Sequence, residues 1–328
     1  MNIFNKKPFL IAEIGVNFHD IAEKDNISDM EAAKLMIREA KNCGIDAVNF
    51  QSYNAEIFGD SSAHDYLKEY RELAEYCSEL DILFLSTPCD FESADYLGEF
   101  MDVYKISSCD ITNIPFIQYI AGKNKPILLS TGASTLNEIK DAVSAIEDVS
   151  TADIAIMHSV LSYPTAYEDA NLAMIKDLAK HFQGYEIGYS DYTKPDGEMM
   201  ILSTAYCYGA TILEKYFTLD KKLLGNDQNH AMDPDDVRTF RKNMSFLSKI
   251  SGHKNKQLLI CETSARRELR KSIVASQDIK KGSKITHNNI TFKRPGTGIS
   301  PSMLDEIIGK VAKENISEST LIDFEMLE

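Results

Sequence analysis

Short apolar runs alternate with amphipathic stretches along the first 250 residues of the chain. The apolar runs are rich in β-branched and aliphatic residues, which is typical of buried strands, and the stretches between them repeat apolar residues at helical spacing. Residues 103–132 show the unit most clearly, because two apolar runs that end in small hydroxyl residues flank a helical stretch. The predicted strands cover residues 9–14, 47–51, 83–87, a run from Val103, a run that ends at Ser130, and then 154–158, 186–190 and 211–217.

A helical pattern follows each of these runs. The predicted helices cover residues 29–43, 66–80, 91–100, 136–149, 172–182, 198–208 and 235–247, with one more inside 103–132. Eight parallel strands, each followed by a helix, close a (β/α)₈ or TIM barrel. We therefore predict an α/β protein built on this barrel. An open, doubly wound sheet is the alternative, but no Gly-x-Gly-x-x-Gly motif follows a predicted strand.

Each predicted strand ends in a polar residue. In a parallel barrel the carboxyl ends of all strands meet on one rim, where active sites lie. The end residues, in chain order, are Glu13, Gln51, Thr87, Lys105 with Ser108, Ser130, His158, Ser190 with Asp191, and Glu214 with Tyr216. Singly, some of them have a structural explanation, such as a buried core histidine for His158 or an ion pair for Glu13. Together they predict one polar site on that rim.

The last part of the chain has a different pattern. Residues 251–270 are polar and charged, which indicates a linker between a barrel domain of residues 1–250 and a small domain of residues 271–328. Within this small domain, residues 278–286 and 315–323 suggest two copies of one short β-turn-β phrase. Between the copies lies a glycine-bearing loop with Arg294, which is well placed to reach a neighbouring site.

Composition narrows the function. The 328 residues carry a net charge of -15, which argues against a nucleic-acid-binding surface and does not favour an anionic membrane. An anionic substrate would therefore need a local cluster of cations. The six cysteines are scattered without a C-x-x-C pair, no apolar run is long enough to span a bilayer, and the first residues do not resemble a signal peptide. These features predict a soluble, cytoplasmic protein with reduced thiols.

Specific motifs extend over nearly the whole chain. They are Ala12-Glu-Ile-Gly-Val-Asn, Phe50-Gln, Ser86-Thr-Pro-Cys-Asp, Tyr104-Lys-Ile-Ser-Ser, Leu129-Ser-Thr-Gly, Ser162-Tyr-Pro, Gly188-Tyr-Ser-Asp, Leu213-Glu-Lys and Phe217-Thr-Leu-Asp. With these motifs the chain resembles the sialic acid synthase family, whose members join phosphoenolpyruvate to an N-acetylated amino sugar to make nonulosonic acids. The tail, with Lys293-Arg-Pro-Gly-Thr-Gly and Ile308-Gly-Lys, resembles the antifreeze-like (SAF) domain of that family.

The resemblance implies a transferase and a role for each matching residue. It implies that Glu13, Asp110 and Glu214 are catalytic, with Asp110 standing where the family usually has a glutamate. The residues implied to bind phosphoenolpyruvate are Thr87, Lys105, Ser108, Ser130 and Ser190, and those implied to bind the sugar are Gln51, Tyr163, Asp227 and Arg294. It also implies a domain-swapped homodimer, in which one subunit lends Arg294 to the barrel of its partner.

Four positions depart from the family pattern. Tyr192 and Tyr216 stand where the family has histidines that bind Mn²⁺ or Mg²⁺, and a neutral phenol is a poor ligand for either ion. Asn49 replaces a lysine that binds phosphoenolpyruvate, and Phe18 replaces a histidine. The resemblance therefore implies a divalent metal whose usual histidine ligands are absent here. His230, in a later loop, is a candidate replacement ligand.

Three hypotheses follow from these departures. In the first, the protein is a synthase in which tyrosine hydroxyls polarise the sugar aldehyde in place of a metal. In the second, it is a divergent paralogue that binds a sugar or regulates a partner enzyme. In the third, Lys105 or Lys215 forms a Schiff base in an aldolase, although both lie among hydroxyls and carboxylates rather than in an apolar pocket. The retained polar residues favour the first hypothesis.

Overall fold

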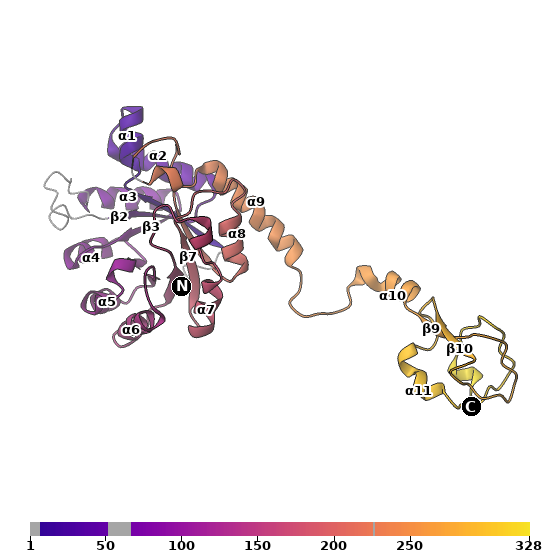
Figure 1. Cartoon of the computed structure of the whole chain (residues 1–328). Helices are drawn as coiled ribbons and strands as arrows, with labels where there is room; N and C mark the ends of the chain where they lie inside the picture. Colours follow the sequence, from indigo (N-terminus) through magenta and orange to yellow (C-terminus); the bar gives the residue numbers. More distant parts are fainter. Residues whose placement is uncertain (1–6, 52–66, 226) are drawn as a thin grey trace. The chain divides into compact units, whose positions relative to one another are not determined.

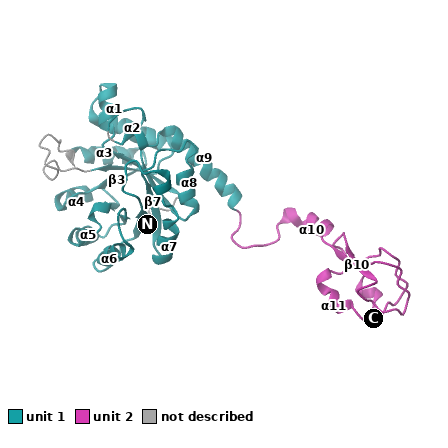
Figure 2. Cartoon of the chain, in the orientation of Figure 1, with its two compact units in different colours: residues 1–251 teal, residues 252–328 magenta. Residues whose placement is uncertain are grey.

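The computed structural model describes residues 7–51, 67–225 and 227–328. The chain divides into two compact units, Met1–Ser251 and Gly252–Glu328, which Figure 2 colours separately. The first unit holds the polar strand ends. Among the described residues, no helix combines the length and the apolar character that crossing a membrane requires.

The first unit is built on an 8-stranded parallel sheet. The strands pair in the order β3-β2-β1-β8-β7-β6-β5-β4, and β3 and β4, at the two ends of this order, contact each other. Their bounds are β1 (Phe9–Gly15), β2 (Ala47–Gln51), β3 (Leu83–Thr87), β4 (Tyr104–Ile106), β5 (Ile127–Ser130), β6 (Ile154–His158), β7 (Glu186–Asp191) and β8 (Ile212–Tyr216). The predicted TIM barrel is thus confirmed.

Helices cover the outside of the strands, as Figure 1 shows for the helices from α3 to α7. Their bounds are α1 (Phe18–Asp25), α2 (Asp29–Cys43), α3 (Leu67–Glu79), α4 (Phe91–Gly98), α5 (Ile114–Ala121), α6 (Leu136–Glu147), α7 (Met174–His181), α8 (Met200–Cys207) and α9 (Pro234–Ser251). Helix α1 was not predicted, because a helix of 8 residues gives a weak periodic signal. Tyr66, the predicted start of α3, lies outside the described residues.

Side-chain capping sets several helix starts. Ser28 caps α2 by accepting from the Glu31 backbone N–H, and the Glu31 carboxylate accepts from the Ser28 N–H in return. The predicted helix at 198–208 begins two residues later, at Met200. The Asp196 carboxylate accepts from the backbone N–H groups of Met200 and Ile201, both at 2.9 Å. These contacts satisfy N–H groups that have no partner inside the helix.

Two apolar layers hold the barrel together. The interior layer consists of strand residues that point toward the barrel axis, among them Ile11, Leu85, Leu128 and Met157. The outer layer packs the other strand faces against the helices. Gly188 on β7 allows the interior layer to close, because a Cβ there would lie 2.8 Å from the Ile212 carbonyl oxygen and closer still to the Met157 sulfur. The polar site rests on this packed layer.

The second unit has its own small core. Strands β9 (Ser272–Ala275) and β10 (Ile290–Lys293) pair in an antiparallel ladder. Each predicted copy, at 278–286 and 315–323, contains two bridged residues on either side of a turn: Ile279 and Lys284 in the first copy, Ile316 and Leu321 in the second. Ile279 and Ile316 are buried and pair with each other in an antiparallel bridge, so the repeated β-turn-β phrase is confirmed. Residues predicted as linker form helix α10 (Thr263–Leu269).

Candidate active site

A pocket of about 420 Å³ lies at the carboxyl ends of the barrel strands. The predicted site residues among its lining are Glu13, Gln51, Thr87, Lys105, Ser108, Asp110, Ser130, Tyr163, Tyr192 and Tyr216. Strand pairing brings several of them together, because Glu13 on β1 is in register with Asn49 on β2 and with Tyr216 on β8. Residues from distant parts of the sequence therefore share one pocket.

A buried cation is held between two carboxylates on one side of this pocket. The Lys105 ammonium lies 3.1 Å from Glu13 Oε2 and 2.9 Å from each carboxylate oxygen of Glu214. The Ser190 hydroxyl donates to Glu214 Oε2 at 2.7 Å. All four side chains are buried. The lysine thus stabilises both carboxylates, and they hold it in a fixed position.

Asn49 occupies the other side of Glu13. Its amide nitrogen donates to Glu13 Oε2 and lies 3.4 Å from the Thr87 hydroxyl. Glu13 Oε1, Asn49 Oδ1 and the Ser130 hydroxyl are buried but have no hydrogen-bond partner in the protein. Buried polar atoms are rarely left unpaired. We therefore expect water or a ligand to complete these contacts.

Burial and the neighbouring charges shift the pKa values of Glu13 and Lys105. Burial raises the pKa of the Glu13 carboxyl to about 7, and the nearby Glu214 charge adds to the increase, while Lys105 opposes it. For Lys105, burial lowers the pKa, but attraction to Glu214 and Glu13 outweighs burial and the net shift is upward. Near neutral pH, Lys105 is therefore charged and Glu13 exchanges its proton readily.

Four aromatic rings form a cluster beside the charged groups. The ring centroids of Tyr163 and Tyr192 are 4.7 Å apart, those of Tyr192 and Tyr216 are 5.9 Å apart, and those of Tyr216 and His230 are 5.0 Å apart. A separation of 6.3 Å between His230 and Tyr163 closes the cycle. We call these four residues the aromatic cluster. The tyrosines of the cluster line the pocket.

The aromatic cluster does not suit a divalent metal ion. Burial raises the pKa of both Tyr192 and Tyr216, so their phenols stay protonated and neutral. His230 and Asp227 approach to 3.4 Å, but the described part of the chain contains no group of three or more His, Cys, Asp or Glu side chains that could hold a metal. Mn²⁺ and Mg²⁺ prefer carboxylate, carbonyl or water ligands, and Mn²⁺ also binds imidazole. The donors present therefore do not fit the metal that the family resemblance implies.

Other predicted residues lie apart from the pocket lining. Phe18 on α1 is buried against Phe50. Asp227 is half-buried and hydrogen-bonds Tyr216 behind the lining. His158 is buried and its Nε2 lies 3.1 Å from the Ala170 carbonyl oxygen, which supports the structural explanation for it. Arg294 is exposed in the second unit, so its role in the site stays a prediction.

Four lining residues were not among the predicted site residues: Cys89, Ser107, Cys109 and Leu161. Ser107 and Cys109 flank the predicted Ser108, and Cys89 follows β3 by two positions. Their position in the sequence, next to polar strand ends, could have identified these three residues as part of the site. Leu161 carried no such signal, since an isolated leucine in a loop does not suggest a binding site.

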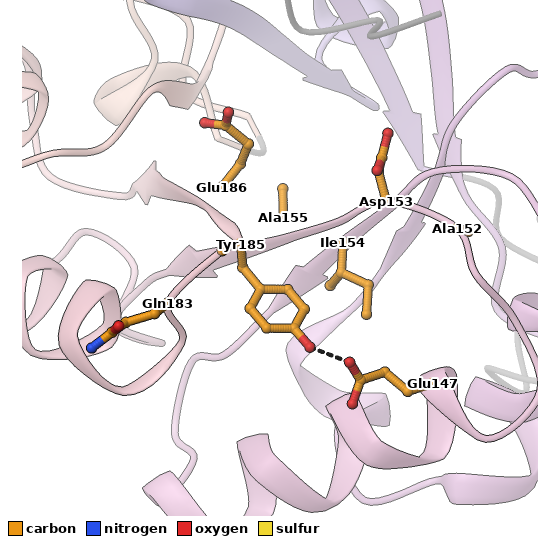
Figure 3. A pocket seen from close by; sticks show the side chains of 9 residues that line it. Glu147, Ala152, Asp153, Ile154, Ala155, Gln183, Tyr185 and Glu186 are labelled. Carbon is orange, nitrogen blue, oxygen red and sulfur yellow. Dashed lines mark hydrogen bonds between the residues drawn. The ribbon is translucent and has the colours of Figure 1, made fainter.

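A second pocket lies at the opposite ends of β6 and β7 (Figure 3). Its lining includes Glu147, Asp153, Tyr185 and Glu186, and the Tyr185 hydroxyl donates to Glu147. Among the described residues that line it, none is a lysine, arginine or histidine. In TIM barrels the amino ends of the strands contribute to stability, whereas chemistry occurs at the carboxyl ends. We therefore assign the active site to the pocket around Lys105.

Comparison with known proteins agrees with this geometry. The NeuB family matches residues 61–256 and the SAF domain matches residues 270–328. The chain is 36% identical to an uncharacterized protein of Methanocaldococcus jannaschii, over 96% of this chain and 93% of that protein. It is 34% identical to the N,N'-diacetyllegionaminic acid synthase of Campylobacter jejuni, over 97% of this chain and 99% of the other.

The chain is also similar to a solved structure of a synthetase. The N-acetylneuraminic acid synthetase of Leptospira borgpetersenii, in complex with citrate, has a TM-score of 0.71 and 32% sequence identity, with 80% of this chain and 90% of that chain covered. The family match extends over more than half of the chain. The chain therefore belongs to the NeuB family of sialic acid synthases and ends in a SAF domain.

Proposed function

We propose that this protein condenses phosphoenolpyruvate with an N-acetylated amino sugar to give a nonulosonic acid and phosphate. The observation that carries the proposal is the Lys105 ammonium, fixed beside a pocket that is lined by hydroxyl groups. Family membership and the named synthase relatives support it. Phosphoenolpyruvate is strongly anionic, and its binding needs a fixed cation with several hydrogen-bond donors.

In this proposal the phosphoenolpyruvate contacts come from five strand-end residues: Thr87, Lys105, Ser108, Ser130 and Ser190. The unpaired Ser130 hydroxyl offers a free donor. The Ser108 hydroxyl accepts from the Gly132 N–H at 2.9 Å, which orients its proton toward other acceptors. Gln51 and Tyr163 in the pocket, with Asp227 behind it, would position the sugar.

The proposed reaction balances with one acid–base group. The π electrons of the enol form a bond from C3 of phosphoenolpyruvate to the aldehyde carbon, and the carbonyl pair moves to oxygen, which takes a proton from Glu13. Water adds to C2 and returns a proton to Glu13. The C2–O bond to phosphate then breaks as the C2 hydroxyl becomes the keto group, and the proton of that hydroxyl passes to the departing phosphate. A carboxyl with a pKa of about 7 suits both proton transfers.

A Schiff-base mechanism is less consistent with this site. A nucleophilic lysine needs a lowered pKa. The pKa of Lys105 is raised by two carboxylates, and Lys215 is buried against Asp191 at 2.8 Å, outside the pocket lining. Both lysines are held in ion pairs with carboxylates. Borohydride treatment with pyruvate should therefore leave both lysines unmodified, as measured by peptide mass spectrometry; a stable adduct would favour an aldolase.

The direct test combines binding with turnover. Calorimetry should detect phosphoenolpyruvate binding, and phosphate should be released only when a suitable N-acetylated amino sugar is added. A panel that contains N-acetylmannosamine and diacetamido-dideoxy hexoses identifies the sugar. Binding of phosphoenolpyruvate without turnover on any sugar would favour the non-catalytic paralogue, and absence of binding would refute the proposal.

We also propose a domain-swapped homodimer in which Arg294 completes the partner's site. Neither Glu13→Gln nor Arg294→Ala should be active on its own. Mixing the two variants and allowing the subunits to exchange should restore activity, because a swapped dimer then contains one site with both Glu13 and Arg294 intact. If Arg294 served the barrel of its own chain, no exchange would produce such a site and activity would stay low.

A further inference from the structure

The aromatic cluster borders the pocket that contains the charged groups. Tyr192 and Tyr216 line the same pocket as Lys105 and Glu13, and the charges of Lys105, Glu214 and Glu13 all act on the Tyr192 hydroxyl. Tyr192 follows the end of β7, and Tyr216 is the last residue of the adjacent strand β8. Their phenols are therefore close to the groups that bind and protonate the reactants.

Neighbouring residues hold these phenols in place. The Gln51 side-chain amide donates to the Tyr216 hydroxyl at 3.1 Å, and Tyr216 also hydrogen-bonds Asp227. Tyr192 hydrogen-bonds Tyr163, and its ring packs against the rings of Tyr163 and Tyr216. Donors that are fixed before the reaction are the kind that stabilise a developing oxyanion.

We infer that, in this chain, the phenol hydroxyls of Tyr192 and Tyr216, and not a divalent cation, hold the carbonyl oxygen of the sugar during condensation. The inference rests on the proposed function. When C3 of phosphoenolpyruvate attacks, negative charge develops on that oxygen. The Tyr216 hydroxyl, which otherwise donates to Asp227, and the Tyr192 hydroxyl, which otherwise donates to Tyr163, turn their protons to it and stabilise it until it is protonated. Because the phenols remain neutral, they add no negative charge to a pocket that already contains Glu13 and Asp110.

The first test treats the full-length protein with a chelator, which removes any bound divalent metal. After treatment with EDTA, phosphate release with the accepted sugar should stay within about twofold of the untreated rate, and added Mn²⁺ should not increase it. The electron paramagnetic resonance signal of free Mn²⁺ should be unchanged by the protein. The double variant Tyr192→His/Tyr216→His should bind Mn²⁺ and diminish that signal, because imidazole is a good ligand for it.

The second test removes one hydroxyl and keeps the ring. Tyr192→Phe should lower kcat by roughly 10²- to 10³-fold, the usual cost of losing one oxyanion donor, with little change in KM for phosphoenolpyruvate. The control Tyr185→Phe removes a phenol that hydrogen-bonds Glu147 at the opposite end of the barrel, and it should leave kcat unchanged. Thermal unfolding of both variants checks that the barrel is intact.

The outcomes separate this inference from the proposed function. Phosphate release that requires Mn²⁺, or a Tyr192→Phe variant with normal kcat, would overturn the inference and leave the synthase proposal standing. If no sugar supports turnover with or without metal, the proposed function fails. In that case the Mn²⁺ signal still decides the metal question, since clear binding by the wild-type protein contradicts the inference.

Discussion

Replacing Glu13 by glutamine should lower turnover by roughly 10²- to 10⁴-fold, the range expected when a general acid–base group is lost. The substitution keeps the shape of the side chain and its place between Lys105 and Asn49. It removes the group that exchanges a proton in the proposed reaction. Steady-state phosphate release measures the effect, and retained phosphoenolpyruvate binding would show that the pocket is intact. A variant with normal kcat would contradict the assignment.

The Glu13→Gln variant should also differ from the wild type in how its binding of phosphoenolpyruvate depends on pH. The pKa of Glu13 is about 7, so the carboxyl is mostly protonated at pH 6 and mostly ionised at pH 8. A bound anion raises this pKa further, and the complex therefore takes up a proton above pH 7. Wild-type affinity for phosphoenolpyruvate should fall by up to about tenfold per pH unit above pH 7 and change less below it.

Glu13→Gln provides the matched control for this proton uptake. It should bind phosphoenolpyruvate more tightly than the wild type at pH 8, since one negative charge is gone, and about equally at pH 6. Its remaining pH dependence reports the titration of the ligand itself. Calorimetry in two buffers of different ionisation enthalpy measures how many protons the protein takes up when phosphoenolpyruvate binds. Identical pH profiles for the two proteins would show that Glu13 is not the linked group.

Replacing Lys105 by methionine should destabilise the barrel and abolish phosphoenolpyruvate binding. The lysine is the buried partner of both Glu13 and Glu214, and removing one member of a buried ion pair costs about 3–5 kcal/mol. The loss should be larger at pH 8 than at pH 5, because protonation of Glu13, whose pKa is raised to about 7, relieves its repulsion from Glu214 in the folded state. Urea unfolding followed by circular dichroism measures the free energy of unfolding at each of the two pH values.

Lys221→Met is the matched control for this loss of stability. Lys221 also bridges two carboxylates, Asp233 and Asp236, but its side chain is 35% exposed. Water screens such a pair, so the change should cost about 1 kcal/mol or less. The double variant Lys105→Met/Glu214→Gln should recover part of the stability but not the binding. Equal effects of the two single variants would show that burial does not set the strength of the Lys105 cluster.

The sequence predicted the barrel because its strands are local features. Runs such as 47–51 and 83–87 match β2 and β3 residue for residue, and the apolar periodicity of 29–43 matches α2. Local signals failed where the element was short, as in α1. A periodic pattern must extend over several helical turns or several strand residues before it can be distinguished from a chance arrangement of apolar residues.

By itself, the sequence determined the alternation of strands and helices, the polar residue at each strand end, and the substitutions at Asn49, Tyr192 and Tyr216. The tertiary structure decided how those residues act on one another. Only the closed barrel brings Glu13, Lys105 and Glu214, from β1, β4 and β8, within hydrogen-bonding distance. The pKa of Glu13 depends on that burial and on those neighbouring charges, which are separated by about a hundred residues in the sequence.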